Sequence, residues 1–361
     1  MLNKNVSALR KGLVSTINGY KIEVIEGKAS FKDANTLTVK NNDTYKTITA
    51  KNIIIATGAE PSIPSTLNIN QNKLLTSNEI LKLDKLPKTL LIIGAGAVGV
   101  EFASIFSEFG SIVTLLEMQE QILPSADIDL ANEVEKNLLR QGIKILKGTN
   151  SSSINFAEFE KILVASGRKP NLNNLALNNA DINYSGNFIQ IDEFMRTNIK
   201  NIYAAGDVTG KAALAHVAQA QGIAAAENAL GAKETVDYST IPWAVFSFPQ
   251  AAWAGQTQNN IQSGSVKFPI SANSRAFLEG ERNGFVKIFF DKASTIITGA
   301  SIVGPNAEEL ISIFTIAIKN KLHLSSLKRE LFFHPSISEA IHSSCEIENY
   351  GAIELPLKKD I

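Results

Sequence analysis

Residues 91–101 read LIIGAGAVGVE and combine a short apolar run with three glycines at G-x-G-x-x-G spacing. LLII is typical of a buried strand and VGVEFASIFSEF of a helix, so the glycines lie at a strand-to-helix turn. In such a turn Gly94 permits the sharp bend, Gly96 lets a pyrophosphate approach the backbone, and Gly99 lets the helix pack closely on the strand. The free N–H groups of the helix N-terminus favour an anion. An ordinary turn is the alternative, but this context favours a dinucleotide site.

The acidic residue Glu117 ends the next predicted strand, IVTLL, at about the distance from the glycines that a ribose-binding carboxylate requires. Met118 and Gln119 follow it, and no arginine is present there to meet a 2′-phosphate. The sequence therefore predicts NAD rather than NADP.

Three further apolar runs end in glycine: IIIATG (53–58), ILVASG (162–167) and IYAAGD (202–207). Glycines often end parallel strands simply to allow the turn, but ligands of open α/β sheets also bind at those ends. The carboxylate of Asp207 could accept hydrogen bonds from a sugar or ribityl chain. A helix beginning near Ala215 could direct its N-terminus at a second ligand.

The composition is that of an ordinary globular chain of two or three domains: 361 residues, 44% apolar and 19% charged, with 35 basic and 35 acidic residues. This charge balance gives no reason to expect a nucleic-acid or membrane-surface partner. No apolar run reaches the roughly 20 residues that span a bilayer, and the first residues lack the apolar core of a signal peptide. We therefore expect a soluble, cytoplasmic protein. The single cysteine, Cys345, excludes a disulfide within these residues.

Strand and helix patterns alternate along the chain, which predicts an α/β fold with parallel sheets. Residues 6–18 fit an amphipathic helix, and residues 20–56, beginning with YKIEVIEG, fit a series of short strands. Residues 127–141 and the alanine-rich residues 213–231 fit helices. From about residue 238 the pattern changes to a mixed α+β domain.

Six motifs in series resemble those of the flavoprotein disulfide reductases, and among them most of all the dihydrolipoamide dehydrogenases. They are ATG (56–58), GAGAVGVE (94–101), ASGRKPN (165–171), NIYAAGD (201–207), ALAHVAQAQGIAAAE (213–227) and HPSISEA (334–340). The resemblance implies Rossmann-like FAD and NAD domains followed by a C-terminal α+β dimerisation domain. It divides the chain into a residual first FAD segment (1–85), a trimmed NAD domain (86–168), a second FAD segment (169–237) and the dimerisation domain (238–361).

The chain departs from this family in two places. Nothing in residues 1–60 reads as a strand followed by a glycine loop, and there is no C-x-x-x-x-C pair, so the FAD domain is expected to be incomplete. The family also places a β-meander between positions equivalent to Thr149 and Ala157, where this chain is short. The adenine-side wall of the NAD domain is therefore expected to differ.

The resemblance assigns cofactor contacts residue by residue. Glu101 would lie near the nicotinamide, Asp207 would hold the ribityl chain, and the helix after Ala213 would direct its positive dipole at the flavin. The NAD contacts are Gly94, Ala95, Gly96, Ala97, Val98, Gly99, Val100, Glu101, Glu117 and Gly167. The FAD contacts are Ala29, Thr57, Gly58, Ala59, Asp207, Ala213, Leu214, Ala215 and His216.

His334 and Glu339 match the catalytic dyad of the family. Disulfide exchange needs a thiolate, and an imidazole with a pKa near neutrality is a suitable base for it. Glu339 would orient the ring. From the residues alone, a surface histidine that caps the following helix is an equal alternative. Phe332 stands where the family often has a second histidine.

The function that the resemblance implies is the oxidation of dihydrolipoamide by NAD⁺ through FAD, in a homodimer. The substrate would be carried on an acyltransferase subunit of a 2-oxoacid dehydrogenase complex. Without the cysteine pair we expect the chain alone not to complete this cycle. Reduction of glutathione, mercuric ion or coenzyme A disulfide is an alternative within the family, and a non-catalytic NAD-binding or dimerisation scaffold is one outside it. No metal site is expected, since the four histidines and one cysteine lack ligand spacing.

Overall fold

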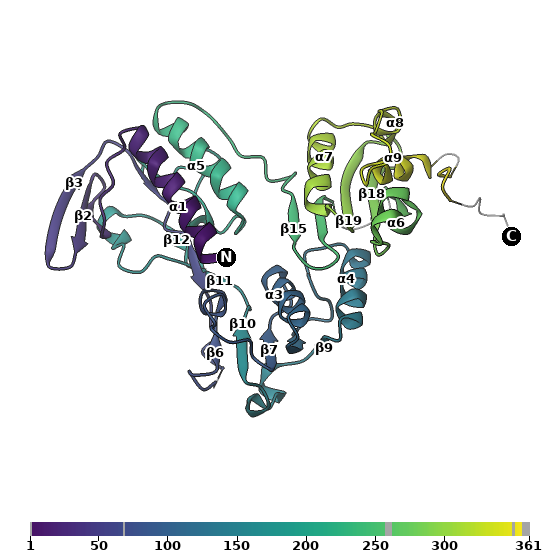
Figure 1. Ribbon diagram of the computed structural model, residues 1–361. Coiled ribbons are helices and arrows are strands. Elements are labelled where there is room, and N and C mark those ends of the chain that lie inside the picture. The colour runs from purple at the N-terminus through teal and green to yellow at the C-terminus, as the bar shows by residue number, and fades with distance from the viewer. Residues whose placement is uncertain (1, 68, 257–261, 349–350, 356–361) are drawn as a thin grey trace. The chain divides into compact units, whose positions relative to one another are not determined.

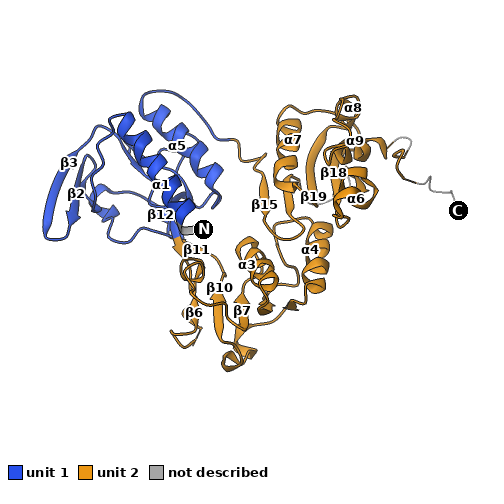
Figure 2. Cartoon of the chain, viewed as in Figure 1, with its two compact units in different colours: residues 1–59, 170–236 blue, residues 60–169, 237–361 orange. Residues whose placement is uncertain are grey.

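The computed structural model describes residues 2–67, 69–256, 262–348 and 351–355, which form two compact units (Figures 1 and 2). Unit 1 comprises residues 1–59 and 170–236, and unit 2 comprises residues 60–169 and 237–361. The predicted α/β fold class is confirmed. The short strands β5 (Ala59–Pro61) and β11 (Arg168–Pro170) pair in a separate two-stranded sheet.

Unit 1 contains a thin parallel sheet, an antiparallel meander and two longer helices. The two-stranded parallel sheet pairs β4 (Ile53–Ile55) with β14 (Ile202–Ala204). The other elements are α1 (Leu2–Gly19), the meander β1 (Lys28–Asp33), β2 (Thr36–Asn41) and β3 (Thr44–Thr49), the hairpin β12 (Tyr184–Ser185) and β13 (Phe188–Ile189), and α5 (Ala215–Ala229). Side chains of Phe31, Ile55 and Ile202 share one core, which ties the meander to the parallel sheet.

The prediction of a strand at residues 20–27 in unit 1 is wrong. The run YKIEVIEG, residues 20–27, alternates apolar and polar residues but forms no strand. Ile22 and Val24 are 57% and 63% exposed, so the alternation does not place a buried face against the core. A period of two predicts a strand only where a neighbouring strand and a core are present to pair and cover it.

Unit 2 contains a five-stranded parallel sheet in the order β6-β10-β7-β8-β9. Its strands and helices are β6 (Leu74–Leu75), α2 (Ser77–Ile80), β7 (Thr89–Ile93), α3 (Ala97–Glu108), β8 (Ile112–Leu116), α4 (Ile128–Arg140), β9 (Lys144–Leu146) and β10 (Lys161–Val164). Successive strands run outward from β7 to β9, whereas β10 lies on the other side of β7. This reversal is the switch point at which open α/β sheets bind ligands.

The pairing of β6 with β10 decides where residues 60–85 belong. Leu74 and Leu75 pair with Ile162 and Leu163. These residues therefore lie with the glycine-loop sheet in unit 2 rather than with residues 1–59.

A second, antiparallel sheet of unit 2 has the order β15-β16-β19-β18-β17. Its elements are β15 (Trp243–Val245), β16 (Ala251–Gly255), β17 (Ser263–Pro269), α6 (Ser274–Glu279), β18 (Phe285–Asp291), β19 (Ile297–Val303), α7 (Ala307–Lys319), α8 (Leu324–Lys328) and α9 (Glu339–Glu346). Helix α3 contacts β8 and β15, and α4 contacts β19. One apolar core accordingly contains side chains from both sheets, such as Leu115 and Trp253.

An ion cluster of four side chains joins the start of α4 to the antiparallel sheet. Lys287 on β18 has a side chain that is 5% exposed, and its Nζ lies 2.8 Å from Asp127 Oδ1 and 3.0 Å from Asp129 Oδ2. Lys267 on β17 lies 3.2 Å from Asp129 Oδ2. Lys287 and Asp127 are the buried members of this cluster, and their pairing compensates the cost of burying the two charges, whereas Lys267 and Asp129 are partly exposed.

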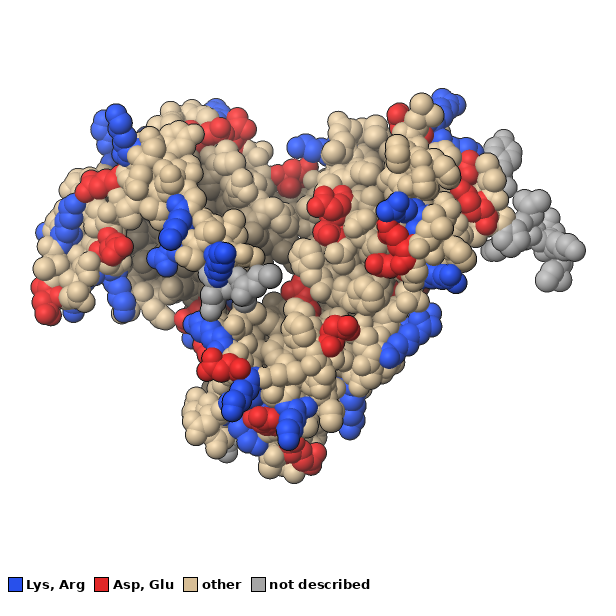
Figure 3. All heavy atoms as spheres, in the orientation of Figure 1, with Lys and Arg blue, Asp and Glu red and all other residues tan. Residues whose placement is uncertain are grey.

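The surface carries charges of both signs. On the face drawn in Figure 3, basic and acidic side chains of the described residues are interspersed. Among the described residues, none of the helices has the length and apolar character needed to cross a bilayer.

The ion cluster makes stability depend on pH. Burial opposes ionisation of Asp129, but hydrogen bonds from Lys287 and Lys267 prevail and lower its pKa. A carboxyl with a lowered folded-state pKa stabilises the fold above its unfolded value of about 3.9, and this contribution is lost as pH falls through the folded value. Asp129→Asn should therefore destabilise the protein at pH 7, by roughly 0.5–1 kcal/mol for this partly exposed group.

Urea unfolding at pH 7 and at pH 3 measures this difference. The gap between wild type and Asp129→Asn should be smaller at the lower pH, because the unfolded carboxyl is mostly protonated there, and Asp84→Asn, at an exposed position, should match wild type at both. A gap of the same size at pH 3 and pH 7 would contradict the electrostatic account.

Candidate functional site

A cleft of about 540 Å³ opens at the carboxyl ends of β7, β8 and β10 in unit 2. This edge includes the switch point of the sheet, between β7 and β10. The described residues that line it are Pro64, Thr66, Leu67, Ile93, Gly94, Gly96, Leu116, Glu117, Met118, Gln119, Pro124, Thr149, Asn150, Ser151, Ala165, Ser166 and Gly167.

The glycine loop is shaped by two close approaches and one open position. Gly94 has φ +104°, and a Cβ there would lie 2.6 Å from the Ala165 carbonyl oxygen. A Cβ on Gly99 would overlap the Gly94 carbonyl oxygen. Gly96, by contrast, has φ −73° and nothing within 4 Å of a built Cβ, although it lines the cleft. The loop thus leaves space at the position where a phosphate can approach the backbone.

Helix α3 begins at this open position. Its N-cap is Gly96, which supplies no side-chain cap for the N–H groups of the first turn. Those N–H groups and the helix dipole form a site for an anion. The cleft therefore fits the pyrophosphate of a dinucleotide.

Glu117 is 9% exposed and is held by two backbone groups. Its Oε2 accepts a hydrogen bond from Ala95 N–H at 2.7 Å, and its Oε1 accepts one from Gln119 N–H at 2.9 Å. A carboxylate has about four lone-pair positions, so each oxygen can accept a further hydrogen bond from a hydroxyl group in the cleft. Glu117 is the only charged side chain among the described lining residues.

The other predicted NAD contacts divide into two groups. Gly167, with φ +127°, lines the cleft together with Gly94, Gly96 and Glu117. The remaining predicted contacts are not among the lining residues: Ala95, Ala97, Val98, Gly99, Val100 and Glu101.

Glu101 contacts the protein rather than the cleft. Its Oε1 accepts a hydrogen bond from Phe246 N–H at 3.0 Å. Burial raises the pKa of Glu101, and the Phe246 hydrogen bond opposes this effect. The side chain joins α3 to the segment that follows β15.

One wall of the cleft comes from the shortened segment after Thr149. Thr149, Asn150 and Ser151 lie in the shortened segment, which forms two short 3-10 turns instead of strands. Lys73 Nζ fixes the end of this segment by donating to the carbonyl oxygens of Ala157 at 3.1 Å and Phe159 at 2.7 Å. The sequence predicted that the wall formed here would differ from that of the family, but an irregular loop has no periodic pattern that identifies which of its residues face the cleft.

The predicted FAD contacts of unit 1 gather at the carboxyl edge of its parallel sheet. Ala204 pairs with Ile55, so Thr57, Gly58 and Asp207 all follow the carboxyl ends of these two strands. Ala29 and Thr57 line one pocket of about 490 Å³, with Asn171 and its neighbours completing the wall. The sequence analysis did not identify Asn171, Asn173 or Asn174 as lining residues.

The N-terminus of α5 follows the same edge of the sheet. Its N-cap Leu214 has no side-chain cap, and Ala213, Ala215 and His216 are exposed around it. The first-turn N–H groups can therefore face a negatively polarised ligand atom. Ala59, also predicted, is half-buried at the start of β5.

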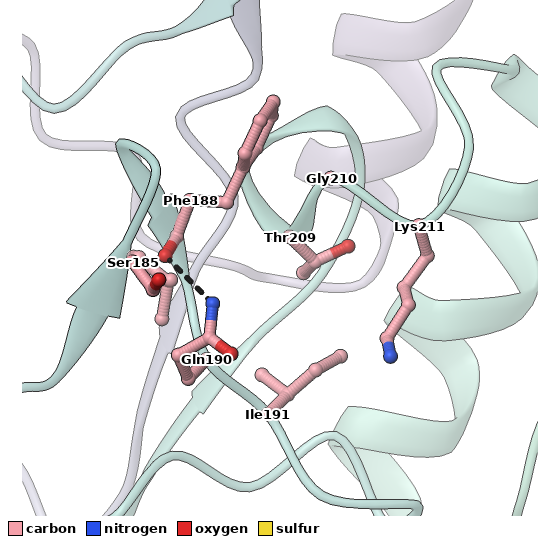
Figure 4. Close-up of a pocket in the computed structure, with 8 residues that line it drawn as sticks. Ser185, Phe188, Gln190, Ile191, Thr209, Gly210 and Lys211 are labelled. Atoms are coloured by element: carbon pink, nitrogen blue, oxygen red, sulfur yellow. Dashed lines mark hydrogen bonds between the residues drawn. The ribbon is translucent and has the colours of Figure 1, made fainter.

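A smaller pocket of about 210 Å³ lies beyond Asp207 in unit 1 (Figure 4). Thr209 and Lys211 lie on one side of it, and Gln190 Nε2 on the other donates to the Phe188 carbonyl oxygen at 3.3 Å. None of the predicted cofactor contacts is among its described lining residues.

His334 and Glu339 form a hydrogen-bonded pair. His334 Nδ1 lies 2.9 Å from Glu339 Oε1, and Glu339 Oε2 accepts a hydrogen bond from Ser336 N–H at 2.8 Å. Glu339 is in the first turn of α9, where the helix dipole stabilises its charge. The His334 side chain is 74% exposed, so the pair can meet a group from outside this chain.

The remaining candidates from the sequence are the thiol of Cys345 and a possible metal site. Cys345 is buried in α9, and burial raises the pKa of its thiol to about 12. Among the described residues there is no cluster of three or more histidine, cysteine, aspartate or glutamate side chains that could hold a metal ion.

Comparison with known proteins decides the family. Residues 2–222 match the domain described as pyridine nucleotide-disulphide oxidoreductase, and residues 241–345 match the dimerisation domain of the same family. The chain belongs to the pyridine nucleotide-disulphide oxidoreductases. Within this family it is an FAD- and NAD-dependent oxidoreductase similar to the dihydrolipoyl dehydrogenases. The dimerisation domain supports a homodimer.

Individual relatives extend over nearly the whole chain. The dihydrolipoyl dehydrogenase of Chlamydia muridarum is 35% identical over 98% of this chain and 79% of its own length. That of Geobacillus stearothermophilus is 32% identical over 95% of this chain and 77% of its own length. Among solved structures, the HOCl-induced flavoprotein disulfide reductase RclA from Escherichia coli has a TM-score of 0.89 and 29% identity, and the match covers 96% of this chain and 84% of that one.

Two glycine substitutions should separate binding from folding. Gly96→Ala adds a methyl group into open space at an ordinary φ, so it should alter stability by less than about 1 kcal/mol but weaken NADH binding. Gly99→Ala meets the Gly94 carbonyl oxygen and should cost several kcal/mol of stability, roughly 2–4. NADH titration and urea unfolding of both variants measure these effects. Equal loss of stability in the two variants would contradict the loop geometry.

Proposed function

We propose that this chain forms the NAD-binding and base-supplying part of a dihydrolipoamide dehydrogenase, which converts dihydrolipoamide and NAD⁺ to lipoamide and NADH. The observation that carries this proposal is the cleft at Gly96 and Glu117, together with the His334–Glu339 pair. FAD and NAD supply the hydride chemistry when bound. The chain's own residues bind the dinucleotide, orient its ribose and move a thiol proton.

Glu117 and the first turn of α3 would share the work of dinucleotide binding. The N–H groups of α3 would meet the pyrophosphate, and the two Glu117 oxygens would accept hydrogen bonds from the ribose hydroxyls. A 2′-phosphate would place negative charge beside this carboxylate, with no cationic side chain among the described lining residues. This supports NAD over NADP.

His334 would accept the substrate thiol proton, and Glu339 would hold the imidazole in the required orientation. The side chains of Leu331 and Phe333, on either side of Phe332 just before His334, are 100% and 78% exposed. An apolar surface of this kind fits coverage by a second subunit. We propose that His334 serves the site of the partner copy.

The thiol chemistry requires a cysteine pair that these 361 residues do not hold. Cys345 is buried and fully protonated at neutral pH, so it does not substitute for the pair. We propose that the pair comes from polypeptide outside these residues. The exposed apolar side chains of α1, such as Leu9 at 77% and Leu13 at 62%, support a covering element on unit 1.

The acyltransferase-borne substrate, the cytoplasmic location and the homodimeric state form part of this proposal. RclA is a disulfide reductase with the same fold. A disulfide other than lipoamide is therefore the alternative substrate for this chain. A scaffold would bind NADH without any redox activity.

The isolated chain supplied with FAD tests the proposal directly. It should bind NADH but give no NAD⁺-dependent oxidation of dihydrolipoamide, because the cysteine pair is missing. Addition of the polypeptide that carries the pair should restore the oxidation. Oxidation of dihydrolipoamide by the isolated chain would refute the proposal that the cysteine pair comes from another polypeptide. If the assembled enzyme acted only on a different disulfide substrate, the proposed substrate would be wrong.

His334→Gln should lower dihydrolipoamide oxidation by the assembled enzyme by roughly 10²–10⁴-fold, the usual contribution of a general base. Glu339→Gln should cost less, since the amide still occupies the position beside the ring. The reduction of an artificial dye by NADH needs no thiol base and should be unchanged in both variants. Loss of dye reduction in His334→Gln would show that the histidine acts elsewhere.

A further inference from the structure

The ion cluster of unit 2 connects the antiparallel sheet to the dinucleotide cleft. Asp127 is 2% exposed and is the N-cap of α4, where its Oδ2 accepts a hydrogen bond from Leu130 N–H at 3.3 Å. Its other oxygen, Oδ1, accepts one from Lys287 Nζ at 2.8 Å. One carboxylate therefore fixes the beginning of α4 to strand β18.

The turn immediately before α4 contacts the glycine loop. Leu123 has φ +48°, and Ala126 N–H donates to the Leu123 carbonyl oxygen at 2.9 Å. Leu123 N–H in turn donates to the Ala95 carbonyl oxygen at 2.9 Å. Pro124, within this turn, lines the cleft. A continuous series of hydrogen bonds and short chain segments thus runs from Lys287 to Ala95.

The bond to Ala95 sets the direction of a group that the cleft uses. The Ala95 carbonyl and the Gly96 N–H belong to one planar trans peptide, so they point in opposite directions. Because the carbonyl points at Leu123, the Gly96 N–H points away from it. Any rotation of this peptide would turn that donor away from its present direction.

We propose that Lys287 is a positioning residue for dinucleotide binding: through Asp127 and the 123–126 turn it holds the glycine loop in its binding conformation. This rests on the proposed binding of NAD at the cleft. Lys287 lies in the part of the chain that matches the dimerisation domain, so the nucleotide cleft depends on a residue of the antiparallel sheet.

The test removes the connection while keeping the helix cap and the charge balance. The double variant Lys287→Met, Asp127→Asn deletes one charge of each sign, and asparagine is a good N-cap. Asp129 retains Lys267. The matched control is Lys136→Met, Glu133→Gln, which deletes an ion pair with an N–O distance of 3.2 Å on the same helix.

Two readouts are measured: hydrogen exchange of the Leu123 amide without nucleotide, and the Kd for NADH. In the double variant the Leu123 amide should exchange faster and the Kd should rise, each by about tenfold, the upper part of the range for residues that couple two sites. The control should match wild type in both. Lys287→Arg keeps the charge and should retain most of the wild-type protection of the Leu123 amide and most of the affinity for NADH.

Asp127→Asn alone, in which Lys287 keeps Asp129, is a milder variant with the same expected direction should the double variant fail to fold. Unchanged Leu123 exchange, or faster exchange with an unchanged Kd, would overturn the positioning role and leave the proposed function intact. A wild-type chain without NADH affinity would overturn both.

Discussion

The close packing of α3 against β7 at the glycine loop is the constraint on which the cleft depends. Gly99 has no Cβ, and this lets α3 approach the Gly94 carbonyl oxygen. Gly94 takes φ +104° beside Ala165, which turns the chain at the end of β7. Together these approaches place Gly96 at the helix N-terminus with open space before it. They also bring the Ala95 N–H within 2.7 Å of Glu117 at the end of the next strand.

In the proposed binding mode, the site would hold an anion with backbone groups and not with cationic side chains. Among the described lining residues the only charge is the Glu117 carboxylate. A pyrophosphate would be stabilised by the first-turn N–H groups of α3 and the helix dipole, which do not depend on any flexible side chain. The same arrangement would repel additional negative charge near the ribose, so affinity and selectivity would both come from one short segment of chain.

The sequence predicted those features that rest on local patterns. The glycine spacing located the turn, and the leucine spacing of residues 127–141 corresponds to α4 at Ile128–Arg140. The Glu117 position followed from the length of one strand. In the carboxyl-terminal region, His334 and Glu339 lie five residues apart, and the hydrogen bond expected between them is present.

Features made by distant residues could not be predicted in this way. Lys287 and Asp127 are 160 positions apart, and Phe246 lies 145 positions from Glu101. Neither pair has a local pattern, since each depends on how β15 and β18 pack on the helices. The wall at Thr149–Ser151 is irregular backbone, and residues 20–27 alternate as a strand does but form no strand and leave Ile22 and Val24 exposed.

Equilibrium titration of the purified chain with NADH and with NADPH tests the central claim most directly, because it depends on the cleft alone. The account predicts saturable binding of one NADH per chain, with NADPH weaker by about tenfold or more, since a 2′-phosphate beside the Glu117 carboxylate costs at least the 1.4 kcal/mol that a tenfold change represents. Binding of neither nucleotide, or equal binding of both, would contradict it.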